Sequence, residues 1–144
     1  FAHMEEIDLC WRAKNRGFKI YYVGKSTIYH LGGGTMRNSN PRKTFLNFRN
    51  SLLTLYKNDQ SSFTSLKILL RLFLDGLAFI KIWSESGSKH AFSILKAHFS
   101  FYRFRKKKIK ASDVNASGIY KGSIVIDFYL TKKSTFNQLK KGFN

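Results

Sequence analysis

The chain has 144 residues, enough for one domain with a hydrophobic core but too few for two large domains. Its formal net charge is +18, and its single cysteine excludes both an internal disulfide and a zinc site built from several cysteines. The excess charge is uneven, because residues 1–60 have ten Lys/Arg and four Asp/Glu whereas residues 61–144 have sixteen and four. The second half therefore favours an anionic partner such as phospholipid, nucleic acid or polyphosphate.

An acidic cluster lies close to the start of the chain. The stretch HMEEIDLCWR (3–12) holds three of the eight acidic residues. We predict a helix over 5–17, with its carboxylates in the first turn, where the helix dipole favours negative charge. Asp8 and Arg12 have the spacing of an ion pair, and Gly17 is a suitable C-cap. No linker precedes this cluster, and we therefore expect the chain to be part of a longer protein.

Two short runs of β-branched and aromatic residues follow. FKIYYV (18–23) and STIYH (26–30) are separated by Gly24-Lys25 and are predicted to be strands. We expect them to need neighbouring strands that the chain does not supply. The glycine-rich run LGGGT (31–35) predicts a loop, since glycines permit positive φ and let backbone N–H groups approach a ligand.

Two apolar helices are predicted next. Residues 41–57 have helical spacing, with Ser39 or Asn40 as N-cap and Pro41 at the first position. The helix over 61–83 has one polar stripe, formed by Lys67, Arg71, Asp75 and Lys81, and is otherwise apolar. Four charges in its eighteen central residues argue against a membrane-spanning helix. It is either a core helix or one that lies in a membrane interface.

The last part of the chain is basic. A helix is predicted over 89–104, followed by RKKKIK (105–110) and a polar stretch (111–118). Residues 118–130 could form a strand or a short helix. The aromatic residues are at helical spacing rather than interleaved with the basic run, which argues against nucleic acid. A basic run after a Phe-rich amphipathic helix fits an anionic membrane surface better.

The acidic cluster also has a chemical interpretation beyond helix capping. Adjacent carboxylates raise one another's pKa, so Glu5 or Glu6 held near a hydroxyl could act as a general base. His30, at the end of a predicted strand beside the glycines, could bind a divalent metal. His3, His90 and His98 are interpreted as structural.

The order of these motifs resembles one protein family. EEIDLCWRAKNRGFKIYYVGKSTIYHLGGGT followed by NPRKTFLNFRNSLL is similar to the C-terminal part of family 2 inverting glycosyltransferases, in the bacterial rhamnosyltransferase-like branch. That family has the segments E-D-x-D-L-x-x-R, G-(Y/F)-K-I and Y-H-x-G-G-(G/S)-T. The resemblance is strong over 5–57 and continues less specifically through 58–144.

The resemblance implies a fold and a division of the chain. We expect an α/β but predominantly helical part of a GT-A fold, the Rossmann-like fold of nucleotide-diphospho-sugar transferases. Residues 1–60 would be the acceptor-side, C-terminal part of the catalytic domain. Residues 61–144 would be a basic amphipathic helical extension that associates with membrane. The family's Asp-x-Asp donor motif is absent from the sequence, so this chain alone is expected to be inactive.

The resemblance also implies roles for individual residues. Glu6 takes the place of the family's catalytic base, usually Asp, which leaves Glu5 as an alternative. Asp8 and Arg12 match positions on the acceptor side, although their pairing could be purely structural. His30 matches a histidine that binds the divalent cation (Mg or Mn) or contacts the donor diphosphate. The loop over the donor phosphates is matched by Gly32, Gly33, Gly34 and Thr35. Polar positions on the next helix, which could contact phosphate or acceptor or could equally be solvated, are matched by Lys43, Arg49 and Asn50.

The function implied is sugar transfer from a nucleotide-diphosphate donor to a glycan or lipid-linked acceptor, in polysaccharide synthesis at the cytoplasmic face of the cell membrane. The alternative is a non-catalytic basic helical module that binds membrane or a protein partner. The donor sugar, the acceptor and the oligomeric state are not determined by the sequence.

Overall fold

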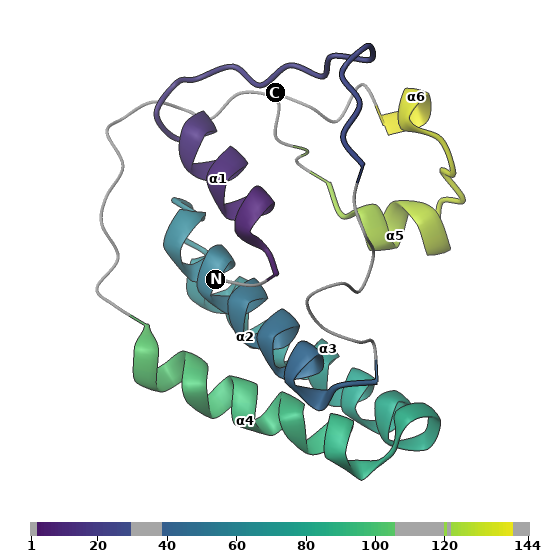
Figure 1. Cartoon of the computed structure of the whole chain (residues 1–144). Coiled ribbons are helices and arrows are strands. Elements are labelled where there is room, and N and C mark those ends of the chain that lie inside the picture. The colour runs from purple at the N-terminus through teal and green to yellow at the C-terminus, as the bar shows by residue number, and fades with distance from the viewer. Residues whose placement is uncertain (1–2, 30–38, 106–119, 121, 140–144) are drawn as a thin grey trace.

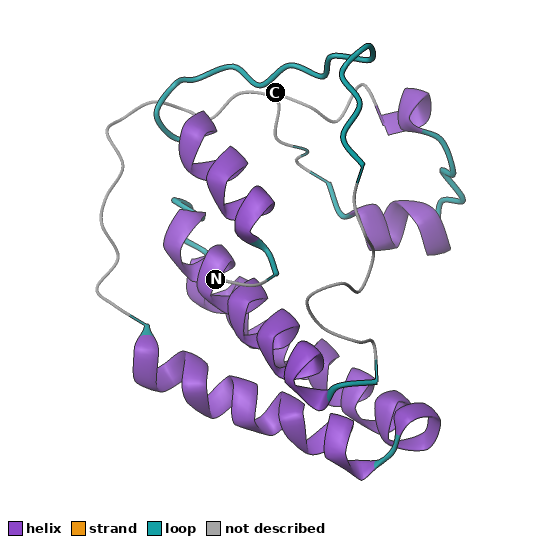
Figure 2. Cartoon of the chain, in the orientation of Figure 1, coloured by secondary structure: helices purple, strands orange, loops and turns teal. Residues whose placement is uncertain are grey.

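The computed structural model describes residues 3–29, 39–105, 120 and 122–139. These residues form six helices and no strand (Figure 2). The protein is therefore predominantly helical, as predicted. The helices are α1 (Glu5–Lys14), α2 (Pro41–Asn58), α3 (Thr64–Ser86), α4 (Ser88–Phe104), α5 (Ile124–Tyr129) and α6 (Phe136–Leu139).

The centre of the fold is a bundle of α2, α3 and α4, with α1 packed against α2 (Figure 1). Its core is small, and Leu52, Ile68 and Phe101 are its buried cluster. The ring of Tyr56 meets Phe101 edge to face, with centroids 5.9 Å apart. Edge-to-face pairs of this kind add stability beyond the apolar area that they bury. Most of the apolar surface of the described residues lies outside this core.

Local signals set the ends of the central helices. Asn40 Oδ1 accepts a hydrogen bond from Arg42 N at 2.9 Å, and Pro41 occupies the first helical position. This confirms the predicted start of the helix over 41–57. Gly87 separates α3 from α4 with φ of 86°, a value that glycine adopts without a Cβ penalty. A single residue therefore reverses the chain, and the two helices pack against each other along their length.

Helix α3 turns Asp75, at the centre of its polar stripe, inward, whereas Lys67 and Lys81 at the ends of the stripe are exposed. Its buried residues are Thr64, Ile68 and Asp75. Asp75 accepts hydrogen bonds from Arg71 Nε at 2.7 Å and pairs with His98 Nε2 at 3.0 Å. The buried carboxylate is thus paired on both oxygens, which removes most of the penalty of burying its charge. Ile68 and Leu72 pack in the core, whereas most of the other bulky apolar residues of α3 are exposed.

The two predicted strands are not formed. Residues 18–23 and 26–29 contain no strand, and His30 lies outside the described residues. The side chains of Tyr22 and Tyr29 are 93% and 96% exposed. The prediction of strands is wrong here because β-branched and aromatic residues form a strand only beside a neighbour that accepts their backbone hydrogen bonds. No such neighbour exists among the described residues, so the α/β part of the predicted GT-A fold is not supported.

The C-terminal part forms a small local unit. Residues 124–129 are helical, which decides between the two predictions for 118–130. Neither α5 nor α6 contacts another of the labelled helices. Of the basic run 105–110 only Arg105 is described, and the polar stretch 111–118 lies wholly outside the described residues. None of the described helices combines the length and hydropathy that crossing a membrane requires.

Candidate functional site

The acidic cluster is divided by the structure into two parts. Glu5 and Glu6 lie in the first turn of α1 with exposed side chains, and neither forms a hydrogen bond or ion pair with any described residue. Asp8, one turn later, is half-buried and bound by three side chains. The helix dipole favours negative charge at all three positions. Two carboxylates therefore remain open to solvent, while the third holds the helix in place.

The backbone that leads into α1 is strained. His3 has φ of 69° and Met4 has φ of 71°, in the left-handed region that residues with a Cβ seldom adopt. The carbonyl of His3 accepts a hydrogen bond from Asn50 Nδ2 at 3.1 Å. Asn50 is fully buried in α2, so this bond ties the strained turn to the bundle. Such strain persists only where surrounding contacts over-determine it, and it is concentrated at functional sites.

Asp8 attaches α1 to the end of α2. Its carboxylate accepts hydrogen bonds from Arg12 Nε at 2.8 Å, from Lys57 Nζ at 3.1 Å and from Asn58 Nδ2 at 2.8 Å. The predicted Asp8–Arg12 ion pair is thus confirmed. Burial by itself would raise the pKa of Asp8, but the hydrogen bonds from Asn58, Lys57 and Arg12 outweigh it and lower that pKa below its ordinary value. Asp8 therefore stays ionised and has the contacts of an anchoring residue.

A second contact completes this junction. Asn15 Nδ2 donates to the carbonyl oxygen of Asn58 at 2.9 Å, and Asn58 Nδ2 also donates to the Thr54 carbonyl at 3.0 Å. Helix α1 has no buried residue, so polar contacts rather than apolar packing define its position. This role of α2 is not among the predictions made from the sequence. The available signal was the repeat of Asn50, Thr54 and Asn58 every four residues, which marks a buried polar stripe.

The three residues predicted on the following helix lie at different places along α2. Lys43 is in its first turn, whereas Arg49 and Asn50 lie in its middle. Arg49 Nε donates to Asn50 Oδ1 at 3.0 Å, and its guanidinium lies 5.0 Å from the centre of the Phe45 ring. Burial and then the charge of Arg42 lower the pKa of Arg49. Arg49 and Asn50 thus form a unit that connects to the strained turn before Glu5.

Two of the histidines that were interpreted as structural form contacts between helices. His90 Nδ1 lies 2.9 Å from Thr44 Oγ1, and its Nε2 lies 3.1 Å from the Ser39 carbonyl oxygen. His90 therefore ties the start of α2 to α4, just as His98 ties α4 to Asp75 of α3. These contacts are consistent with structural roles for both side chains.

The predicted donor-phosphate loop and metal ligand cannot be placed. His30, Gly32, Gly33, Gly34 and Thr35 all lie outside the described residues. Within the described ranges, no group of three or more His, Cys, Asp or Glu side chains is arranged to hold a metal ion. The residues that are described thus offer no set of ligands for the divalent cation implied by the resemblance.

A second polar cluster lies near the C-terminus. Asp127 accepts hydrogen bonds from Lys133 Nζ at 2.7 Å, from Thr131 Oγ1 at 3.1 Å and from the Tyr120 hydroxyl. These hydrogen bonds lower the pKa of Asp127, and the bond from Lys133 has the largest effect. The bond between Tyr120 and Asp127 also raises the pKa of the Tyr120 hydroxyl. The cluster closes the turn after α5, and it makes no contact that brings it near α1.

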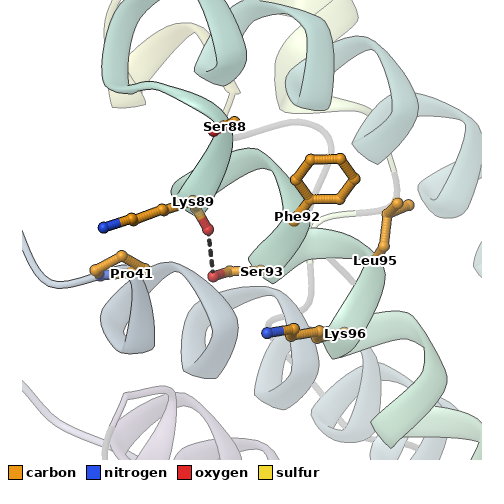
Figure 3. Close-up of a pocket in the computed structure, with 7 residues that line it drawn as sticks. All are labelled: Pro41, Ser88, Lys89, Phe92, Ser93, Leu95 and Lys96. Atoms are coloured by element: carbon orange, nitrogen blue, oxygen red, sulfur yellow. Dashed lines mark hydrogen bonds between the residues drawn. The ribbon is translucent and has the colours of Figure 1, made fainter.

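An open pocket of about 570 Å³ lies where α4 passes the start of α2 (Figure 3). Its apolar lining comes from Phe92, Leu95 and Pro41, and Lys89 and Lys96 are at its edge. None of the predicted site residues lines it. In Figure 3, Lys89 and Lys96 extend to one side of α4, whereas Phe92 and Leu95 lie on the other.

Comparisons with protein-family models, with curated proteins and with solved structures give no match to this chain. The resemblance in the sequence motifs and the geometry described above are therefore what supports a proposal about function.

Proposed function

We propose that this chain supplies the acceptor-side part of an inverting glycosyltransferase that uses a nucleotide-diphosphate sugar. The observation that carries the proposal is the pair of solvent-exposed, unengaged carboxylates of Glu5 and Glu6, held at the end of a strained turn. Asp8 and Asn50 attach this turn to the bundle from two directions. A general base requires such a combination of a free carboxylate and a fixed backbone.

The proposed chemistry uses Glu6 as the base. Its carboxylate takes the proton of an acceptor hydroxyl while the hydroxyl oxygen attacks the anomeric carbon of the donor. The bond from that carbon to the diphosphate oxygen breaks on the opposite side, and the nucleoside diphosphate leaves with the electron pair. The configuration at the anomeric carbon is therefore inverted. Glu5 is the alternative base, and Arg49 and Lys43 are proposed to contact anionic groups of the substrates.

Two parts of the proposal rest on the sequence resemblance alone. One is the binding of a divalent cation (Mg or Mn) by His30, and no step of the proposed reaction is derived through it. The other is a donor-binding half with an Asp-x-Asp motif, which this chain lacks and which a longer protein would have to supply. The acceptor would be a glycan or a lipid-linked glycan at the cytoplasmic membrane face.

The test is a transfer assay on the protein that contains both halves, with a panel of nucleotide sugars. Glu6→Gln should lower kcat by about 10²-fold or more, because general bases contribute roughly 10²–10⁴-fold, and should leave donor binding unchanged. Glu5→Gln tests the alternative base. Glu85→Gln, which changes an exposed carboxylate on α3, is the matched control and should retain full activity. Full transfer by both Glu6→Gln and Glu5→Gln would contradict the proposal.

A further inference from the structure

Helix α3 buries a charged residue and leaves many of its bulky apolar side chains exposed, which is unusual for a helix at the surface of a bundle. Asp75 is only 2% exposed and pairs with Arg71 and with His98 of α4. The guanidinium of Arg71 lies 6.0 Å from the centre of the Phe48 ring on α2. A surface helix normally turns its apolar stripe to the core and its charges to water. Here the ion pairs of Asp75 hold the centre of the polar stripe inside, and the bulky apolar side chains on the opposite side of the helix are exposed.

This outer surface of α3 is continuous and large. It consists of bulky apolar side chains that recur every three or four residues over four turns of helix, each more than half exposed to solvent. Exposed apolar patches of this extent are uncommon in proteins without a binding partner. The residues are Leu66, Leu69, Leu70, Phe73, Leu74, Leu77 and Ile80.

The apolar surface continues onto α4 at the turn between the two helices. The Trp83 ring lies 5.8 Å from the Phe92 ring, and the Phe79 ring lies 5.9 Å from it. Phe92, Leu95 and Phe99 then extend the exposed apolar surface along α4. We refer to this combined face of α3 and α4, from Leu66 to Phe99, as the outer apolar surface.

The exposed charges around the outer apolar surface are mostly positive. Asp75 is the only acidic residue between residues 60 and 84, and it is buried. Glu85, at the end of α3, is exposed and lies 3.8 Å from Lys81, and no further acidic residue occurs from 86 to 112. Lys81 is exposed beside the surface on α3, and Lys89 and Lys96 are exposed on the flank of α4. A cationic border around an apolar face is complementary to a layer of anionic headgroups above an apolar interior.

We propose that the outer apolar surface docks on an anionic lipid membrane, with α3 lying in the plane of the interface. The leucines and Phe73 enter the boundary between headgroups and acyl chains. The lysines contact the headgroup phosphates, and the Trp83–Phe92 pair lies at headgroup level, where amphipathic aromatic rings are favoured. The charge border favours a membrane over a second copy of the chain, since two cationic faces repel each other. This docking goes beyond the proposed transferase activity and does not depend on it.

The experiment measures binding of the whole chain to phosphatidylcholine vesicles with and without phosphatidylglycerol, by co-sedimentation. The chain has two tryptophans, so in Trp11→Phe the indole of Trp83 is the single fluorescent reporter. We expect binding to anionic vesicles, a blue shift of Trp83 emission, and at least ~10-fold weaker binding to neutral vesicles, because each basic residue adds attraction. High salt should weaken the binding without removing the blue shift of the bound fraction.

The decisive variant is Leu70→Gln/Phe73→Gln/Leu77→Gln. All three side chains are more than half exposed, so the variant should keep its helix content, which circular dichroism checks. Binding should fall by roughly tenfold or more, since the apolar area that enters the lipid is lost. The matched control is Tyr21→Ser/Tyr22→Ser/Tyr29→Ser, which removes a similar exposed apolar area away from α3 and should bind as the unaltered chain does.

Several results would overturn the proposal. One is the absence of vesicle binding by a chain with intact helix content, and another is an equal loss of binding in the control variant. Equal binding to neutral and anionic vesicles would contradict the role given to charge. A dimer in light scattering without lipid, abolished by the α3 variant, would show that a second copy covers the surface instead.

Discussion

The two helix junctions of this protein are built in opposite ways. Helix α1 has no buried residue, and it is attached to α2 by hydrogen bonds through Asp8, Asn15 and Asn50 and by the Lys57–Asp8 ion pair. The α3–α4 junction also has a buried polar centre, at Asp75, but it is surrounded by apolar surface that faces outward. Polar contacts fix direction and register in both places. The second junction leaves a large apolar area exposed on α3.

The difference separates the two proposed functions in space. At α1, the anchoring contacts leave Glu5 and Glu6 free, which suits proton transfer. At α3, the anchoring contacts leave an apolar face free, which suits a membrane interface. In each case the groups that are buried determine which groups remain available to a partner.

The largest expected effect on stability is at Asp75. Asp75→Ala removes the shared partner of Arg71 and His98, and should lower the free energy of unfolding by about 3 kcal/mol, as breaking a buried ion pair does. Urea unfolding followed by circular dichroism measures it. Glu85→Ala removes an exposed ion pair of 3.8 Å on the same helix and should cost less than about 0.5 kcal/mol. Equal costs for the two variants would contradict the inward orientation of α3.

A smaller and more local effect is expected at Asn50. Asn50→Ala removes the hydrogen bond to the His3 carbonyl from a fully buried position, at a cost of about 1–2 kcal/mol. Hydrogen exchange should show faster exchange in α1 with little change in α4. Uniformly faster exchange through the whole bundle would mean that α1 does not open as a separate unit.

The attachment of α1 should depend on pH through Asp8. The folded-state pKa of Asp8 lies below its ordinary value of 3.8, so the stabilisation is present above that value and is lost as the pH falls through the lower folded-state pKa. We expect it to contribute about 1 kcal/mol, since the carboxylate is only partly buried. Exchange of α1 amides at pH 5 and in strong acid measures it. Asp8→Asn should show little of this dependence, and an unchanged pH profile in that variant would exclude Asp8 as its source.

The smallest effect is expected in residues 18–29. Tyr22 and Tyr29 are almost fully exposed, so replacing either with Ser should change stability by less than about 0.5 kcal/mol. Thermal unfolding of the two variants gives the value. A loss of more than 1 kcal/mol would mean that these residues are paired as strands in solution, as the sequence pattern predicts.

The structural features that could be predicted from the sequence are those set by residues close together along the chain. The predictions of helices over 5–17, 41–57, 61–83 and 89–104 depend on spacing, on Pro41 and on the glycines, and these act within a few residues of the chain. The Asp8–Arg12 ion pair could be predicted for the same reason, because its two residues lie one helical turn apart. The candidate base at Glu5 and Glu6 was also found from local pattern, although its role remains a proposal.

The tertiary structure decided everything that depends on distant partners. Whether 18–29 forms strands depends on neighbouring strands, which the described residues do not provide. The stripe of Lys67, Arg71 and Asp75 was visible in the sequence, but its direction was not. A helix with one polar and one apolar side can turn either side inward, and His98 on α4 supplies the contact that favours the polar side. Asn50 and Asn58 acquire their roles in the same way, because the groups they bind lie more than forty residues away.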